Sequence, residues 1–375
     1  MSSLLAVNEN NAAAGSAEPE LTHAFSLAVV ERSNGGSERE YILVHEKANR
    51  GWWLPGGGID EGETAEEAAL RECVEEAGAK ISVDGILRVE TNPNRMRVIY
   101  RAHLKEPGRP LKSIPDKESK GAIWATASLA EALQRRELNM EDNWLRGKEP
   151  KWWFRYLSDG HRVAPLGFLN SSKIGTPPEN PKSKCGSLMA KLIRVVVLND
   201  SACPTMCMLT KFESEGKWKV PGGSFSSEYE RRGYFSRANA FESRARELVG
   251  KDFGLVGILG VDHYVKCGAN DTDKQTAMLR VCYLAAPIKS GDSKGVFENE
   301  YHWRLVDEIV KGKNANICED NLAGFPRMDL SLYLKRAIEG EVQPLSMVAM
   351  EHVKPPMLRK RRKEGDTLKR AQVYD

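Results

Sequence analysis

The stretch GGIDEGETAEEAALRECVEEAGA, residues 57–79, determines how the first half of the chain folds. Its opening glycines follow a proline and cannot propagate a helix, so the stretch begins as a turn. Thr64 offers a hydroxyl as N-cap, and Glu67, three residues later, completes a capping box. Strong helix formers fill residues 65–77, and Gly78 supplies a left-handed stop. The sequence therefore predicts a loop that leads into a helix of about three to four turns.

The C-terminal part of this helix carries three carboxylates on one face, those of Glu72, Glu75 and Glu76. Like charges at this spacing destabilise a helix by about 0.2–0.5 kcal/mol per pair, and the helix dipole adds to the penalty. Arg71 compensates only part of this charge. A hard cation such as Mg²⁺, which prefers carboxylate oxygens, compensates more. The alternative is a solvated acidic face.

The spacing of these residues resembles the Nudix box, G-x5-E-x7-R-E-U-x-E-E-x-G-U, in which U is a bulky apolar residue. The chain matches its fixed positions with Gly57, Glu63, Arg71, Glu72, Glu75, Glu76 and Gly78. The two U positions hold the small residues Cys73 and Ala79. The predicted strands on either side extend the resemblance to the Nudix hydrolase superfamily across residues 21–170.

The resemblance implies hydrolysis of a diphosphate linked to another moiety, with Mg²⁺ or Mn²⁺ as cofactor. It implies four metal ligands, namely the carbonyl of Gly57 and the carboxylates of Glu72, Glu75 and Glu76, of which Glu76 is the main one. Arg71 and Glu63 are expected to form a buried ion pair that orients the glutamates.

Substrate choice lies outside the box. Glu118, in a loop before a predicted strand, is a candidate base or substrate contact, and a surface acid is the alternative. Arg97 shares a strand face with Arg95 and Arg101, so it is a candidate contact for a polyphosphate. These residues favour a small-molecule nucleotide or another diphosphate as substrate.

The chain repeats itself after residue 187. The motif WKVPGG at residues 218–223 is similar to WWLPGG at residues 52–57, and Arg246-Glu247 matches Arg71-Glu72. Asn170 to Ser187, rich in proline and polar residues, is typical of a linker. The predicted fold is therefore α/β, with two tandem Nudix-type α/β/α sandwich domains and mixed sheets.

The predicted boundaries are a disordered tail (1–20), a catalytic Nudix domain (21–170), a linker (171–187), a degenerate Nudix-like domain (188–345) and a basic tail (346–375). Gly250 and Lys251 replace the second pair of glutamates in the second copy. We expect this copy to bind no Mg²⁺ and to be a pseudo-dimer partner within the chain.

Composition excludes extreme classes of protein. The 375 residues are 41% hydrophobic and 29% charged, with a net charge of +3, which is typical of a soluble globular protein. Seven cysteines, an odd number, favour reduced thiols and a cytoplasmic location, and no run of apolar residues is long enough for a membrane span. The basic run 359–363 (RKRRK) leaves nuclear location and RNA binding open.

Three other functions compete with nucleotide pyrophosphohydrolysis. The chain could bind nucleotides or RNA through its second copy, or be a scaffold with vestigial activity. As a hydrolase it could instead act on RNA 5′ ends or diphosphoinositols. An intact first box beside a degraded second one favours catalysis in the first.

Overall fold

The computed structural model describes residues 20–33, 35, 38–92, 94–137, 144–175, 187–212, 217–224, 240–267, 276–288, 301–311, 325–349 and 354–356. Residues 1–19 of the predicted N-terminal tail, most of the predicted linker and the basic run 359–363 lie outside these residues.

The first half of the chain (residues 20–174) contains eight strands and a set of short helices. In order these are β1 (Glu20–Arg32), β2 (Glu40–Glu46), β3 (Gly51–Trp53), β4 (Gly56–Gly58), α1 (Ala65–Ala77), β5 (Ile81–Asn92), β6 (Arg95–Leu104), β7 (Gly121–Thr126), α2 (Ala127–Arg135), α3 (Glu149–Ser158), η2 (Leu166–Phe168) and β8 (Leu169–Ile174).

The second half (residues 187–349) repeats this order. Its elements are β9 (Ser187–Leu198), β10 (Met206–Phe212), β11 (Lys217–Lys219), β12 (Gly222–Ser224), α5 (Ala240–Val249), β13 (Phe253–Lys266), β14 (Thr276–Pro287), β15 (Tyr301–Leu305), α6 (Val306–Val310), α7 (Leu330–Ile338), η3 (Leu345–Met347) and β16 (Val348–Ala349).

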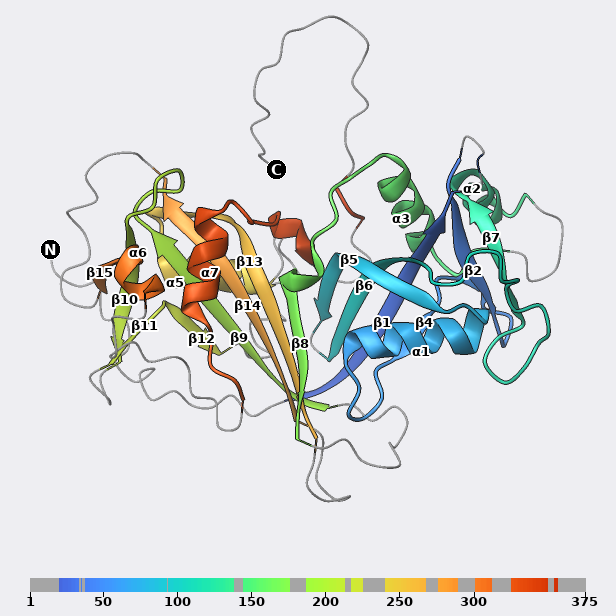
Figure 1. The fold of residues 1–375 in the computed structure, drawn as a ribbon, viewed down its shortest axis with the longest axis horizontal. Coiled ribbons are helices and arrows are strands. Elements are labelled where there is room, and N and C mark those ends of the chain that lie inside the picture. The colour runs from blue at the N-terminus through green and yellow to red at the C-terminus, as the bar shows by residue number, and fades with distance from the viewer. Residues whose placement is uncertain are drawn as a thin grey trace, which may run out of the picture.

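The strand pairing is the same in both halves (Figure 1). In the first half β1 is antiparallel to β2 and β4 and parallel to β6, which is antiparallel to β5, while β3 and β7 flank β2. In the second half β9 is antiparallel to β10 and β12 and parallel to β14, and β13, β11 and β15 take the corresponding places. The protein is thus α/β with two mixed sheets, as predicted.

Side chains along β1 point alternately to the two faces of the first sheet, and helices cover both faces. Ala28 and Val30 belong to the core that also contains the apolar side of α1, whereas Leu27 and Val29 pack with α3. In the second sheet β9 alternates likewise between a core containing α5 and one containing α6 and α7. Each sheet is therefore the middle layer between helices.

Helix α1 begins and ends as its sequence predicts. The Thr64 hydroxyl accepts from the backbone N–H of Glu67, and the Glu67 carboxylate accepts from the backbone N–H of Thr64. Gly78 closes the helix in the left-handed conformation, with a φ of 66°. Both local signals, the capping box and the glycine stop, are confirmed.

The predicted linker and C-terminal tail both include a strand that the sequence analysis missed. Leu169–Ile174 form β8, which runs parallel to β13 of the second half. Val348–Ala349 form β16, which runs parallel to β5 of the first half. In β8 only Leu169 is buried, so its composition resembles that of a linker although its backbone is paired. The first sheet therefore consists of β1–β7 and β16, and the second of β8–β15.

Among the helices in the described part of the chain, none is both long and apolar enough to cross a membrane.

Candidate active site

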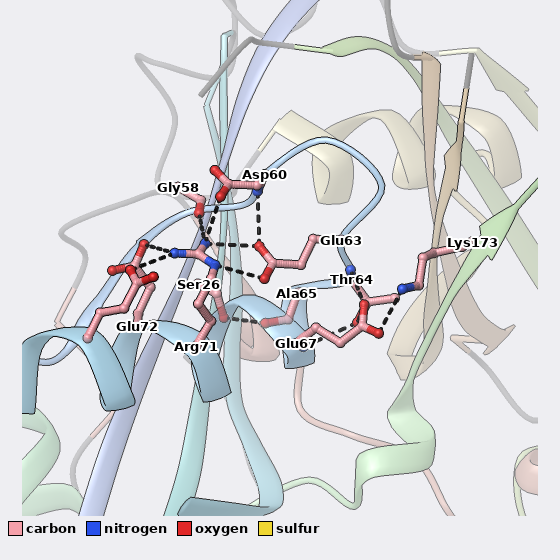
Figure 2. A network of polar contacts seen from close by, with 11 residues as sticks. Ser26, Gly58, Asp60, Glu63, Thr64, Ala65, Glu67, Arg71, Glu72 and Lys173 are labelled. Carbon is pink, nitrogen blue, oxygen red and sulfur yellow. Dashed lines mark hydrogen bonds and ion pairs between the residues drawn. The ribbon is translucent and has the colours of Figure 1, made fainter. Parts of the chain in front are cut away.

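Arg71, on the second turn of α1, is the centre of a polar network around the loop before the helix (Figure 2). Its Nε and Nη2 donate to the two carboxylate oxygens of Glu63, each at 2.9 Å. Nη2 also donates to the carbonyl of Gly58 at 2.8 Å. Nη1 donates to Glu72 at 2.9 Å and to Glu75 at 3.2 Å. Arg71 thus ties the loop to the carboxylates of the helix, as the predicted orienting pair requires, although it is part-exposed.

The carboxylate of Glu72 lies directly against the backbone of Gly57. A Cβ added to Gly57 would lie 2.1 Å from Oε1 of Glu72, so only glycine leaves room for the acid there. Glu72 is 5% exposed. The structure therefore brings Gly57 and the carboxylate of Glu72 together.

Glu76 lies one turn further along α1 and faces the same loop. Its Oε2 accepts a hydrogen bond of 2.9 Å from the backbone N–H of Gly56. Burial raises the pKa of Glu76 to about 8; the hydrogen bond opposes this shift, whereas the nearby carboxylates of Glu72, Glu46 and Glu118 add to it. Acidic neighbours thus surround a buried carboxyl that is costly to ionise.

The chemistry of this donor set fits a hard divalent cation. The groups that face the loop are oxygen donors, and a cation would supply the positive charge that Glu76 needs for ionisation. Within the described ranges no three His, Cys, Asp or Glu side chains are already grouped as a metal site. Arg71 holds the carboxylates of Glu72 and Glu75 in the present arrangement.

The structure separates the two predicted substrate contacts. Glu118 lies near Glu76, since its carboxylate raises the pKa of that group. Arg97, by contrast, is 5% exposed and donates to Glu90 and to Glu149, the latter at 2.8 Å. Its charge is therefore balanced inside the protein, on the sheet face that α3 covers.

Three further residues shape the site, and none of them is a fixed position of the box. Ser119 donates its hydroxyl to the carbonyl of Glu76 at 2.6 Å, which docks the Glu118 loop onto the end of α1. Lys112 donates to the carbonyl of Glu75 at 2.7 Å, a favourable place for a cation at a helix C-terminus. Asp60 lies 3.7 Å from Arg71. Ser119 and Lys112 act through contacts distant in sequence, for which the box offers no signal, and Asp60 stands at a position that the box leaves unspecified.

In the second sheet, an arginine lies next to the glycine turn where the first sheet has a glutamate. Helix α5 ends at Val249, and Gly250 follows with a φ of 74°, so the turn that carries Glu75 and Glu76 in α1 has no helical counterpart. The guanidinium of Arg244 lies 3.6 Å from the Cβ position of Gly223, where the first sheet has a carboxylate. Glu247, the surviving acid, pairs with Arg244 at 3.1 Å.

Comparisons with known proteins agree with this geometry. Residues 22–144 match the family model described as the NUDIX domain. Nudix hydrolase 21, chloroplastic, of Arabidopsis thaliana is 30% identical over 119 residues, which are 31% of this chain and 57% of that protein. The human 8-oxo-dGDP phosphatase NUDT18 is 36% identical over 95 residues, 24% of this chain and 29% of that one.

A solved NUDIX hydrolase from Nitrosomonas europaea is 20% identical, with a TM-score of 0.28, and the match covers 38% of this chain and 73% of that one. The chain spans less than two thirds of the length of the curated relatives it matches. The box geometry and the family match coincide in the same residues. Residues 22–144, which contain the candidate site, thus match the NUDIX domain of the Nudix hydrolases.

Proposed function

We propose that the first half of the chain is a metal-dependent hydrolase that cleaves a diphosphate linkage in a nucleoside diphosphate derivative. The observation that supports this best is the convergence of Glu72 and Glu76 on the Gly56–Gly57 turn, with Arg71 holding the first of them. The human relative is named for a nucleotide substrate, 8-oxo-dGDP, which favours a nucleotide here as well.

Each residue of the site has a distinct task in this proposal. Gly57, Glu72, Glu75 and Glu76 would hold Mg²⁺ or Mn²⁺, which when bound polarises phosphate oxygens and activates a water. Arg71 and Glu63 fix the direction of the carboxylates. Glu118, close to Glu76, is placed to accept a proton or to contact the substrate.

We assign hydrolysis to residues 21–170 and no hydrolysis to residues 188–345. The fixed positive charge of Arg244 against Gly223 disfavours a divalent cation in the second sheet, as does the missing last turn of α5. In this proposal the second half is a structural partner for the first within one chain.

Replacement of Glu76 by Gln tests the site. Glu76→Gln removes a charge from the metal ligands, and metal charge stabilisation is worth several kcal/mol, so turnover should fall about a thousand-fold. Glu66→Gln is the matched control, because Glu66 is an exposed glutamate of the first turn of the same helix and not one of the proposed ligands. Turnover would be measured with Mg²⁺ and with Mn²⁺, together with circular dichroism of each variant. Full activity of a folded Glu76→Gln would contradict the proposed mechanism.

A substrate panel tests the proposed chemistry. It should contain nucleoside di- and triphosphates, their oxidised forms, ADP-ribose, dinucleoside polyphosphates, diphosphoinositols and capped RNA. We expect release of phosphate or a nucleotide from a nucleoside diphosphate derivative. Turnover restricted to diphosphoinositols or capped RNA would contradict the nucleotide assignment, while leaving the metal site intact.

A further inference from the structure

The two halves of the chain exchange their last strands. After η2 the chain leaves the first sheet, and β8 pairs in parallel with β13 of the second sheet, as Figure 1 shows. After η3 it leaves the second sheet, and β16 pairs in parallel with β5 of the first sheet. Each sheet thus ends on a strand that belongs to the other half.

The exchange has the same register on both sides. Leu169 pairs with Val261 where β8 enters the second sheet, and Val348 pairs with Val89 where β16 enters the first. The next pair is Asn170 with Asp262 on one side and Ala349 with Glu90 on the other. Sequence repetition alone does not require this match, because the exchanged strands have different sequences. The match instead indicates two equivalent acceptor edges.

Both acceptor strands have the same glycine bulges where the departing chain crosses them. β5 has register shifts at Gly85 and β13 at Gly257. A Cβ at Gly85 would lie 2.3 Å from Cγ1 of Val163, and one at Gly257 would lie 2.4 Å from Cγ1 of Val342. The glycines therefore let the crossing segment approach the strand closely on its way to the other sheet.

A buried ion pair stands beside each exchanged strand. In the first sheet Glu90 pairs with Arg97, and in the second Asp262 pairs with Arg280 at 2.7 Å. Asn170 of β8 donates to Asp262 at 3.3 Å and to the hydroxyl of Tyr264 at 2.6 Å. Glu90, the partner of Arg97, is thus also the residue that pairs with Ala349 of β16.

One hydrophobic core runs through the junction. The cluster that contains Val89 and Val98 of the first sheet also contains Val261 and Val281 of the second. Val348 of β16 belongs to it and is fully buried. The halves also meet where β1 pairs with β9 over three residue pairs, compared with six for β8 with β13 and two for β16 with β5.

We infer that each half is an obligate structural partner of the other, and that the second half completes the sheet that carries the candidate active site by donating β16 to the open edge of β5. This role is independent of the substrate and of the proposed hydrolysis. It explains why the second half keeps its strands and crossing segment although its own box is degraded.

Cleavage of the intact chain between the halves tests the inference. A specific protease site inserted between Lys182 and Ser183 would be cut after the protein has folded. If the strands are exchanged, the pieces remain one particle with the mass of the whole chain in gel filtration, since each holds a strand of the other. Separation of the pieces under native conditions would overturn the inference.

A cross-link identifies the strand that holds the pieces together. Ile174 of β8 pairs with Lys266 of β13, so Ile174→Cys with Lys266→Cys, in a Cys267→Ser background, should form a disulfide. After cleavage and denaturation without reductant, the pieces should migrate as one band. Ile174→Cys alone, in the same background, is the control and should give two bands. Two bands from the double variant would overturn the exchange of β8.

Val348→Asp addresses the reciprocal strand. It places a carboxylate where Val348 is fully buried against β5, so the cleaved pieces, still joined through β8, should separate at a lower concentration of urea than those of the wild type. Pieces that stay together to the same extent as wild type would contradict a role for β16. If this variant does not fold, the cysteine pair still decides the question, and the substrate panel remains a separate test of hydrolysis.

Discussion

At the scale of single residues, Arg71 is the group on which the geometry of the candidate site depends most. Its guanidinium uses the fixed fork of its nitrogens to hold Glu63 with two bonds while reaching Gly58 and Glu72. Lys has one nitrogen and cannot make this arrangement. Arg71 is therefore a positioning residue, whose charge matters less than its shape.

Arg71→Lys should lower kcat by about ten- to a hundred-fold while leaving the protein folded, because the positive charge is kept but the fork is lost. The change should fall on kcat rather than KM, since the glutamates are misaligned without a direct loss of substrate contact. Arg246→Lys is the matched control, because Arg246 has the equivalent place on α5 and pairs with Glu242 of the same helix. An unchanged kcat in Arg71→Lys would contradict the positioning role.

The residues of the site differ in how well the sequence predicts them. Glu63, Arg71 and Glu72 follow from fixed spacings on a loop and one helix, and their contacts are local. Arg97 is different, because strand periodicity predicts a shared face but not which partners cover that face. Glu90, opposite Arg97 on β5, lies there, and so does Glu149, which is 52 residues away in the chain.

At the scale of elements, α1 is specified by signals close to it in the sequence, whereas β8 depends on contacts distant in the chain. The capping box, helix formers and stop of α1 are all within the helix or next to it, so its limits are predicted correctly. β8 has no such signal, because its pairing depends on an acceptor edge almost a hundred residues away in the chain. Prolines and polar residues after Leu169 favour a linker, whereas the strand continues to Ile174.

The segment that crosses β13 packs so closely on Gly257 that a single added methyl group should destabilise the protein. Gly257→Ala should lower the free energy of unfolding by about 1–3 kcal/mol, because the new Cβ would overlap both Val342 and the carbonyl of Gln343. Gly254→Ala on the same strand is the control, since its nearest neighbour would be at an ordinary 3.5 Å. Urea unfolding would measure both. Equal stability of the two variants would show that the crossing segment is not closely packed.

At the scale of the whole molecule, the continuous core makes the two halves unfold together. The cluster that contains Val98 of the first sheet also contains Val281 of the second. Unfolding of one sheet would expose the apolar surface of the other. A change of stability in the second sheet should therefore appear in the activity of the first.

Acid provides a way to observe this coupling, through His263 in the second sheet. Burial lowers the pKa of His263 to about 4 from its ordinary 6.5. Above pH 6.5 the imidazole is neutral in the folded and unfolded chain, so it has no effect on stability. As the pH falls below 6.5, the unfolded chain binds a proton that the folded chain refuses, and about 2 kcal/mol of stability should be lost by pH 5.

His263→Gln, which does not titrate in this range, should show a shallower loss of Tm between pH 7 and pH 5 than the wild type. Loss of hydrolytic activity on heating should follow the same transition as far-UV circular dichroism in both proteins, because the halves unfold as one. Parallel pH dependences would remove His263 as the cause. Activity that survives the first unfolding transition would contradict a single cooperative core.

The position of β16 near the end of the chain also affects the order of events during synthesis on the ribosome. All residues of the Nudix box are translated early, yet the open edge of β5 is covered only after Val348 has left the exit tunnel. At ordinary rates of translation, the rest of the chain takes on the order of ten seconds to be made. The nascent first half therefore exposes an unpaired strand edge for that interval, and a premature stop codon shortly before codon 348 leaves it exposed permanently.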